Sequence, residues 1–184
     1  MKPEILFIHC AGPQDHFEGS DFLISYLRKT LGDSYSIHSP KMPDSENPHY
    51  DSWKEKVDRE LNAMKEAPIL IGHSLGGSVL LKYLSESSAS KSITGLFLIA
   101  APYWGTTGWE VDEFVLKHDF ATHLHSVPRI FLYHSKDDEV VALPHVRYYS
   151  HQLPGATVHE INHRGHLYSK GLPELITDIK NLPV

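Results

Sequence analysis

Short apolar runs recur along this chain, and they are apolar at consecutive positions rather than at alternate ones. Ile-Leu-Phe-Ile at residues 5–8 and Leu-Phe-Leu-Ile at residues 96–99 are examples. A strand that is apolar on both faces is typical of a parallel sheet buried between two layers. The pattern predicts strands at residues 5–9, 35–38, 68–72, 96–100, 130–134 and 158–161.

Longer amphipathic or polar segments separate these runs. They predict helices at residues 20–31, 51–65, 75–87 and 172–182, and an irregular, then weakly helical, segment at 103–126. Strands that alternate with helices favour an α/β fold with a mainly parallel sheet and helices on both faces. Such sheets bind ligands at the carboxyl ends of their strands, so we expect the functional residues there.

The length of 184 residues suits a single domain over residues 1–184, because it supports a real core and no linker or internal repeat divides it. The formal net charge is −6, and no block of Lys and Arg occurs. The chain therefore has no basic segment of the kind that binds nucleic acid or an anionic membrane surface. We expect neither as a partner.

Cys10 is the single cysteine, so no disulfide can form within the chain. The N-terminal apolar run is too short for a signal peptide, and no run approaches the ~20 apolar residues that span a bilayer. These features favour a cytoplasmic protein.

The run Gly-His-Ser-Leu-Gly at residues 72–76 directly follows one predicted strand and opens a predicted helix. In that context Gly-x-Ser-x-Gly is typical of a nucleophile elbow, a tight turn that exposes the serine. The turn leaves little room two residues before and after Ser74, and Gly72 and Gly76 meet that need. Free amides at the helix start would face an oxyanion formed at Ser74. The alternative is a simple strand-to-helix connection in which Ser74 caps the helix.

A serine hydroxyl needs a histidine to remove its proton, and that histidine needs a carboxylate to orient it. After a nucleophile elbow, the histidine is expected to follow the last strand, where both His163 and His166 lie. Gly165 gives the backbone freedom to turn the next imidazole toward Ser74. We therefore favour His166 and keep His163 as the alternative.

The orienting acid is expected after the strand at residues 130–134, where Asp137 and Asp138 both occur. One carboxylate would orient the histidine, and the other would cap the turn or stay in solvent. Spacing along the chain does not separate the two aspartates.

With these three segments, the chain resembles the α/β-hydrolase superfamily, and within it the small serine hydrolases of the retinoblastoma-binding-protein-9 and YdeN type. The resemblance runs across nearly the whole chain. It rests on residues 72–77, on Ser-Lys-Asp-Asp-Glu-Val-Val at 135–141 and on Gly-His at 165–166. It implies a compact α/β-hydrolase fold with little or no lid domain, Asp138 as the catalytic acid and His166 as the base.

The resemblance also implies an oxyanion hole built from two backbone amides. Leu75 supplies one, and the loop after the first strand supplies the other. That loop reads His-Cys-Ala-Gly-Pro at residues 9–13, whereas most relatives have His-Gly at the first two of these positions. We assign the second amide to Ala11, with Cys10 as the alternative, and interpret the cysteine as a buried structural residue.

The retinoblastoma-binding property does not carry over. That interaction is associated with a Leu-x-Cys-x-Glu segment, whereas the only cysteine here lies in Ile-His-Cys-Ala-Gly at residues 8–12. Nothing in the sequence indicates an oligomeric state.

Together these residues predict a carboxylesterase-like serine hydrolase that cleaves small ester, thioester or amide bonds through an acyl-enzyme on Ser74. Its partner would be a small acyl substrate, and the reaction requires no metal or organic cofactor. Tyr103, Trp104, Trp109 and Phe114 would either line an acyl pocket or form a packed helix face. The functional alternatives are a peptidase or amidase, and a non-catalytic or weakly active interaction module on the same fold.

Overall fold

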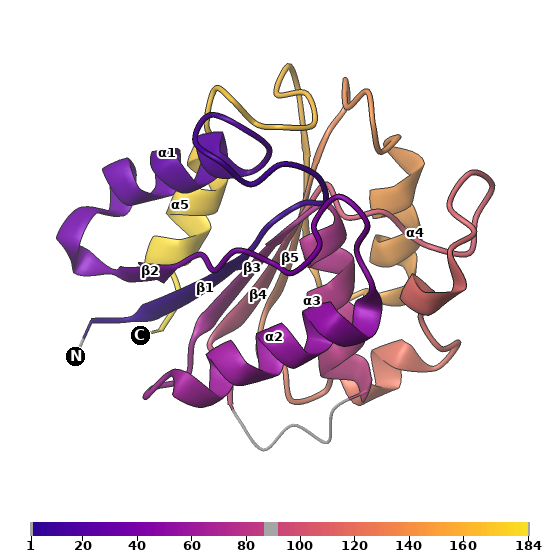
Figure 1. Ribbon diagram of the computed structural model, residues 1–184, viewed down its shortest axis with the longest axis horizontal. Helices are drawn as coiled ribbons and strands as arrows, with labels where there is room; N and C mark the ends of the chain where they lie inside the picture. Colours follow the sequence, from indigo (N-terminus) through magenta and orange to yellow (C-terminus); the bar gives the residue numbers. More distant parts are fainter. Residues whose placement is uncertain (1, 87–91, 184) are drawn as a thin grey trace.

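A single parallel sheet organises the part of the chain that the computed structural model describes, residues 2–86 and 92–183 (Figure 1). Within that part its six strands lie in the order β2-β1-β3-β4-β5-β6. Every neighbouring pair is parallel. The strands are β1 (Glu4–Ile8), β2 (Ser36–His38), β3 (Ile69–His73), β4 (Gly95–Ile99), β5 (Ile130–Ser135) and β6 (Thr157–Ile161).

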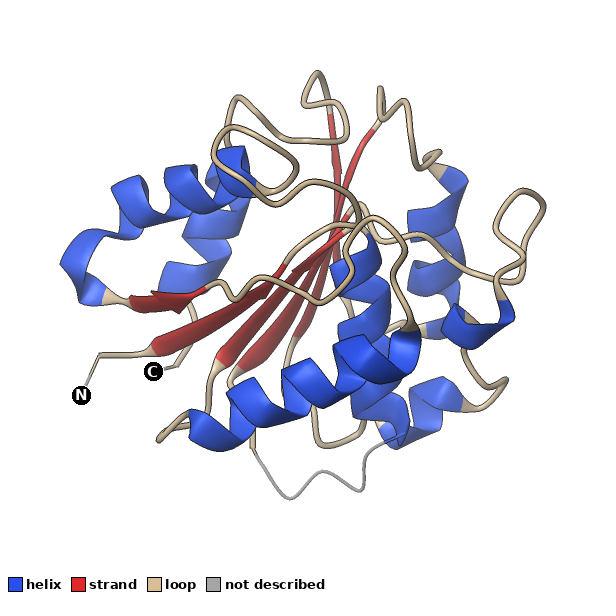
Figure 2. Ribbon diagram, viewed as in Figure 1, coloured by secondary structure: helices blue, strands red, loops and turns tan. Residues whose placement is uncertain are grey.

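Helices cover both faces of this sheet (Figure 2). Helices α1 and α5 lie together on one face, and α2, α3 and α4 lie on the other. Their bounds are α1 (Asp21–Leu31), α2 (Tyr50–Ala63), α3 (Leu75–Glu86), α4 (Pro144–Gln152) and α5 (Pro173–Lys180). Short 3₁₀ helices occupy Gly32–Ser34, Asp112–Phe114 and Phe120–His123.

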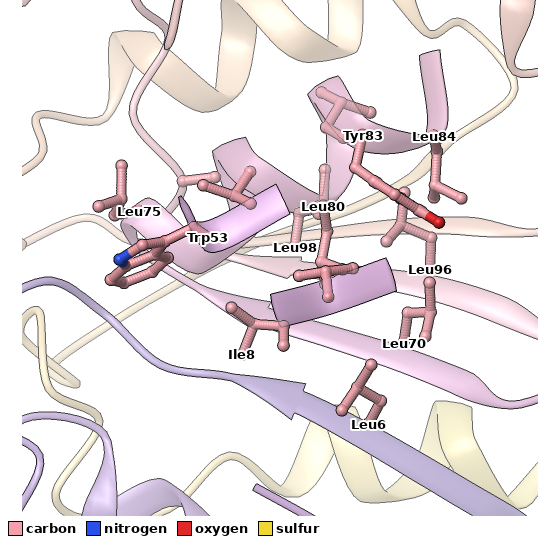
Figure 3. Close-up of a cluster of buried hydrophobic side chains, with 14 of the residues drawn as sticks. Leu6, Ile8, Trp53, Leu70, Leu75, Leu80, Tyr83, Leu84, Leu96 and Leu98 are labelled. Atoms are coloured by element: carbon pink, nitrogen blue, oxygen red, sulfur yellow. The ribbon is translucent and has the colours of Figure 1, made fainter. Parts of the chain in front are cut away.

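Alternation along each strand explains why both faces are apolar. In β1, Ile5 and Phe7 pack with the α1 and α5 layer, whereas Leu6 and Ile8 pack with the α2 and α3 layer. Successive side chains of a strand point to opposite faces, so a strand between two helical layers must be apolar throughout. Figure 3 shows the second layer, in which Trp53 of α2 and leucines of α3 cover the strands.

The chain reverses its direction of travel across the sheet at β1. Helix α1 leads from β1 to β2 on one side, and α2 then carries the chain back to β3 on the other side. The connection that follows β1 runs toward β2, and the connection that follows β3 runs the opposite way, toward β4. Where two neighbouring parallel strands are followed by connections in opposite directions, a crevice opens at their carboxyl ends. The loops after β1 and β3, which contain Ala11 and Ser74, meet at this crevice.

The predicted fold class is confirmed, and each predicted strand and helix has a counterpart shifted by at most two residues at either end among the described residues. The end of the helix predicted at 75–87 falls on Ser87, which lies outside the described residues. Helix α4 was not predicted. Its sequence, Pro-His-Val-Arg-Tyr-Tyr-Ser-His-Gln, buries only His145, Val146 and Tyr149 and has no apolar period to reveal it. Proline at its start was the available signal.

The glycine at position 76 sets how closely α3 approaches β1. A Cβ added to Gly76 would lie 2.5 Å from the carbonyl oxygen of His9, and it would also clash with the carbonyl of Ile8. Backbone atoms cannot move aside as the end of a side chain can. The elbow therefore packs backbone against backbone.

We expect Gly76→Ala to lower the free energy of unfolding by about 3 kcal/mol, because the methyl group forces α3 away from the sheet. Urea denaturation measures the change. Gly155→Ala is the control, because nothing lies within 4 Å of a Cβ at that loop position. Its effect should stay within about 0.5 kcal/mol. Equal effects of the two substitutions would contradict the close approach described here.

Candidate active site

Ser74 occupies the strained turn expected of a nucleophile elbow. Its φ is +53°, in the left-handed region that non-glycine residues rarely adopt. The Ser74 amide donates to the carbonyl of Ile99 at 2.8 Å, which ties the turn to the end of β4. Gly72 leaves no space for a Cβ either, because one would lie 2.6 Å from Gly77. The turn is thus held rigidly on both sides of the serine.

A cavity of about 630 Å³ opens at this turn and contains Ser74, Leu75, His166 and Ala11 in its wall. We call it the active-site pocket. Its volume lies in the range of small-molecule sites. Six large apolar side chains dominate the rest of the wall: Trp104, Trp109, Val111, Phe114, Val140 and Leu167.

The structure brings His166 and Asp138 together. The Nδ1 atom of His166 lies 2.9 Å from Oδ2 and 3.0 Å from Oδ1 of Asp138. A carboxylate only accepts, so Nδ1 carries the hydrogen and Nε2 keeps its lone pair for another proton. Because His166 also lines the pocket that holds Ser74, this tautomer has the form of a general base.

Asp138 is fully buried and held as a carboxylate. Burial by itself would raise the pKa of Asp138. The hydrogen bond from His166 and the amides of Val141 and Val140 outweigh burial and lower the pKa. A second buried imidazole, His134, lies 3.7 Å from Oδ2 and donates from Nε2 to the Val141 carbonyl at 2.6 Å. Burial lowers the pKa of His134, so this neighbour stays neutral.

Asp137 binds the loop backbone, whereas the ring of His166 is bound by Asp138. Oδ1 of Asp137 accepts the Ser135 hydroxyl and the amides of Arg164 and Gly165. Those donors, Ser135 foremost, lower the pKa of Asp137 to about 2. The alternative base, His163, has an 87% exposed side chain and lies 3.9 Å from the outer oxygen of Asp137. Of the two aspartates and the two histidines that the sequence left as alternatives, the structure brings together Asp138 and His166.

Leu75 and Ala11, whose backbone amides are the predicted oxyanion donors, both line the pocket beside Ser74. Leu75 is the first residue of α3, so its amide has no partner within the helix. The amide of Cys10 donates to Ser20 Oγ at 2.9 Å and is therefore occupied. The Ala11 amide has no hydrogen bond among the described residues. Of the two alternatives, Ala11 is therefore the residue whose amide has no partner among the described residues.

Ser20 and His73 link the loops that meet at the pocket. His73 Nε2 lies 2.9 Å from the carbonyl oxygen of His166, which can only accept, so Nε2 carries the hydrogen. Nδ1 of the neutral ring then accepts the Ser20 hydroxyl at 2.9 Å. The hydroxyl oxygen in turn accepts the Cys10 amide. One hydrogen-bonded chain therefore joins the loop after β1, the start of α1, the elbow and the backbone of His166.

This chain requires an uncharged His73. The ring is fully buried, and burial lowers the pKa of His73 to about 4. Ser20 and His73 are site residues that the sequence does not predict. Their partners are 53 and 93 positions away along the chain, and no local pattern records such a contact.

The aromatic residues between β4 and β5 divide into two groups. Trp104, Trp109 and Phe114 line the pocket, and the ring of Trp104 contacts each of the other two with centroids about 5 Å apart. Tyr103 does not line it, so its predicted place there is wrong. Its ring packs on Tyr149 of α4 at 5.0 Å. No helix longer than a 3₁₀ turn forms between β4 and β5, so the alternative of a packed helix face is also wrong.

Among residues 2–86 and 92–183, no three His, Cys, Asp or Glu side chains are grouped so that they could hold a metal ion. No helix in the same ranges has the length and apolarity to cross a membrane.

Comparison with known proteins identifies relatives of this chain. A family model described as serine hydrolase matches residues 18–172. YdeN of Bacillus subtilis strain 168, which is named as a hydrolase, is 23% identical over 141 residues, or 76% of this chain and 74% of YdeN. The YdeN crystal structure superposes with a TM-score of 0.82 at 20% identity, covering 97% of each chain.

A second solved structure extends the likeness of fold. The 2-hydroxy-6-oxo-6-phenylhexa-2,4-dienoate hydrolase of Rhodococcus sp. strain RHA1 superposes with a TM-score of 0.72 at 16% identity. The match covers 97% of this chain and 89% of the Rhodococcus chain. These structures show that the chain has the α/β-hydrolase fold.

We expect Ser20→Ala to lower the free energy of unfolding by about 1–3 kcal/mol, because it leaves the Cys10 amide and His73 Nδ1 buried without partners. Urea denaturation measures the loss. Ser150→Ala is the matched control, since the Ser150 hydroxyl is exposed and bonds only within α4. Its effect should stay within about 0.5 kcal/mol. A Ser20→Ala protein as stable as this control would refute the chain of hydrogen bonds.

Proposed function

Because this chain belongs to the serine hydrolase family, we propose that it hydrolyses small carboxylic esters through an acyl-enzyme on Ser74. One observation carries the proposal. His166 holds its Nδ1 hydrogen on the buried carboxylate of Asp138, while its ring lines the same pocket as Ser74. That arrangement supports a base with a free Nε2 beside a strained, rigidly held hydroxyl.

In the first half-reaction the Ser74 hydroxyl oxygen attacks the ester carbonyl carbon, and its proton passes to Nε2 of His166. Asp138 stabilises the resulting imidazolium. The carbonyl electrons move onto oxygen, where the amides of Leu75 and Ala11 receive the charge. Each such donor lowers the barrier by roughly 3 kcal/mol. The tetrahedral intermediate then collapses, the ester C–O bond breaks, and the leaving alkoxide takes the proton from His166.

In the second half-reaction water replaces the alcohol. His166 removes a proton from the water as it attacks the acyl carbon, and the same two amides bind the new oxyanion. Collapse of this intermediate breaks the bond to Ser74. The proton on His166 returns to the serine oxygen, and a carboxylic acid leaves.

The proposal is tested by labelling the folded protein with a fluorophosphonate probe. We expect one covalent adduct in the wild type and none in Ser74→Ala, read by intact mass. Hydrolysis of p-nitrophenyl esters should exceed that of the matching p-nitroanilides, as expected of an esterase rather than an amidase. Folded wild-type protein that takes no label would overturn the catalytic function and favour an interaction module.

The two adjacent aspartates make a sharper test of the triad. We expect Asp138→Asn to lower kcat on the order of 10³ to 10⁴-fold, because an amide stabilises the wrong His166 tautomer. Asp137→Asn is the control of equal size and charge change. It should reduce stability, because it weakens the loop contacts to Arg164 and Gly165, but should lower kcat far less than Asp138→Asn. Steady-state kinetics with one p-nitrophenyl ester decides, and a larger loss in Asp137→Asn would reverse the assignment.

A further inference from the structure

We propose that the active-site pocket takes uncharged, apolar esters and discriminates against anionic ones, and that Glu113 sets this charge preference. The inference rests on the proposed esterase function and adds the class of substrate. It comes from the charges and the exposed apolar side chains that surround Ser74.

Glu113 is the one carboxylate among the described residues that line the pocket, and no Lys or Arg lines it. The other ionisable groups in the wall besides Cys10 are the imidazoles of His49 and His166. A substrate carboxylate or phosphate would therefore meet a negative charge and find no permanent cation to pair with. Removing such a group from water without a partner is strongly unfavourable.

The carboxylate of Glu113 is fixed in place by the start of α2. Its Oε2 accepts the amide of Tyr50 at 2.7 Å, and its Oε1 lies 3.4 Å from Nδ1 of His49. The side chain is still 36% exposed. Glu113 therefore keeps a defined position at the pocket wall while its charge reaches the pocket.

The ammonium group of Lys82 contacts the backbone of the segment that carries Glu113 and lies outside the pocket wall. Lys82 of α3 donates to the backbone carbonyls of Glu113 and Val115, each at 2.9 Å. It also lies 3.8 Å from Glu86 and over the ring of Tyr50. Lys82 is not part of the pocket wall, so it anchors the segment that carries Glu113 without facing the substrate.

Exposed apolar side chains in the pocket wall indicate that the rest of the substrate is apolar. Val111, Val140 and Leu167 are 46%, 53% and 37% exposed, and all three line the pocket. They come from three different loops, so apolar surface surrounds Ser74 on more than one side. An ester that is apolar on both sides of the scissile bond would cover them, and removing this apolar surface from water favours binding. Thioesters of coenzyme A, which carry phosphates, do not fit this description.

The experiment compares p-nitrophenyl hexanoate with the mono-p-nitrophenyl ester of adipic acid, which replaces the terminal methyl group by a carboxylate. At pH 8 and low salt we expect kcat/KM to be higher for the hexanoate by about tenfold or more, since like charges repel strongly in a pocket of low polarity. Glu113→Gln keeps an oxygen to accept the Tyr50 amide. It should narrow the ratio about threefold or more by raising the rate with the adipate ester.

The dependence of kcat/KM on ionic strength distinguishes an electrostatic role of Glu113 from a structural one, because a structural role would not change this dependence. Raising the ionic strength should increase kcat/KM for the adipate ester in the wild type, and this dependence should flatten in Glu113→Gln. Asp33→Asn is the matched control, because it removes one carboxylate from the short 3₁₀ helix after α1, outside the pocket wall. It should leave the hexanoate to adipate ratio unchanged.

The outcomes separate this proposal from the function on which it rests. If the wild type hydrolyses both esters equally, or if Glu113→Gln leaves the ratio and its salt dependence unchanged, the charge preference is refuted while the esterase function stands. If the wild type hydrolyses neither ester and takes no fluorophosphonate label, the proposed function itself fails, and the charge preference fails with it.

Discussion

Contact of backbone with backbone at Gly76 is the constraint on which the rest of the site depends. The first turn of α3 lies directly against the carbonyls at the end of β1, with no side chain between them. That closeness brings the Leu75 amide and the loop containing Ala11 to the same pocket. It also requires the chain to turn sharply at Ser74, whose positive φ records the strain. The proposed oxyanion site and the position of Ser74 in the pocket wall thus both follow from one close approach of helix and strand.

Hydrogen bonds then couple this turn to segments that the sheet alone would leave independent. The buried ring of His73 reaches Ser20 in one direction and the backbone of His166 in the other. Because Ser20 also occupies the Cys10 amide, the same interaction leaves Ala11 as the free donor. Burial favours the neutral ring that this requires. The proposed base and the proposed oxyanion site are therefore held by the same hydrogen-bonded chain.

The strands and the nucleophile elbow could be predicted from short stretches of sequence. The choice between neighbouring side chains could not, because it depends on the direction in which each side chain points after folding. Consecutive apolar residues predicted the strands, and the glycines around Ser74 predicted the elbow. Asp137 and Asp138 could not be separated from their own turn, because neighbours in one polar turn differ only in what they face after folding. The choice of Asp138 came from the resemblance, and its contact with His166 agrees with that choice. Helix α4 is not predicted, because it buries only three side chains and so presents few apolar positions in the sequence.

Chemistry and selectivity are built from different parts of this chain. Ser74, Asp138 and His166 follow strands β3, β5 and β6, whose positions the sheet fixes. Glu113, Trp104 and the exposed valines of the pocket belong to irregular segments, which similarity of fold at 16–20% identity does not constrain. Relatives that share this fold can therefore differ in the residues that line the pocket. On our proposal, the charge of the pocket wall, rather than the proposed triad, determines which esters this chain takes.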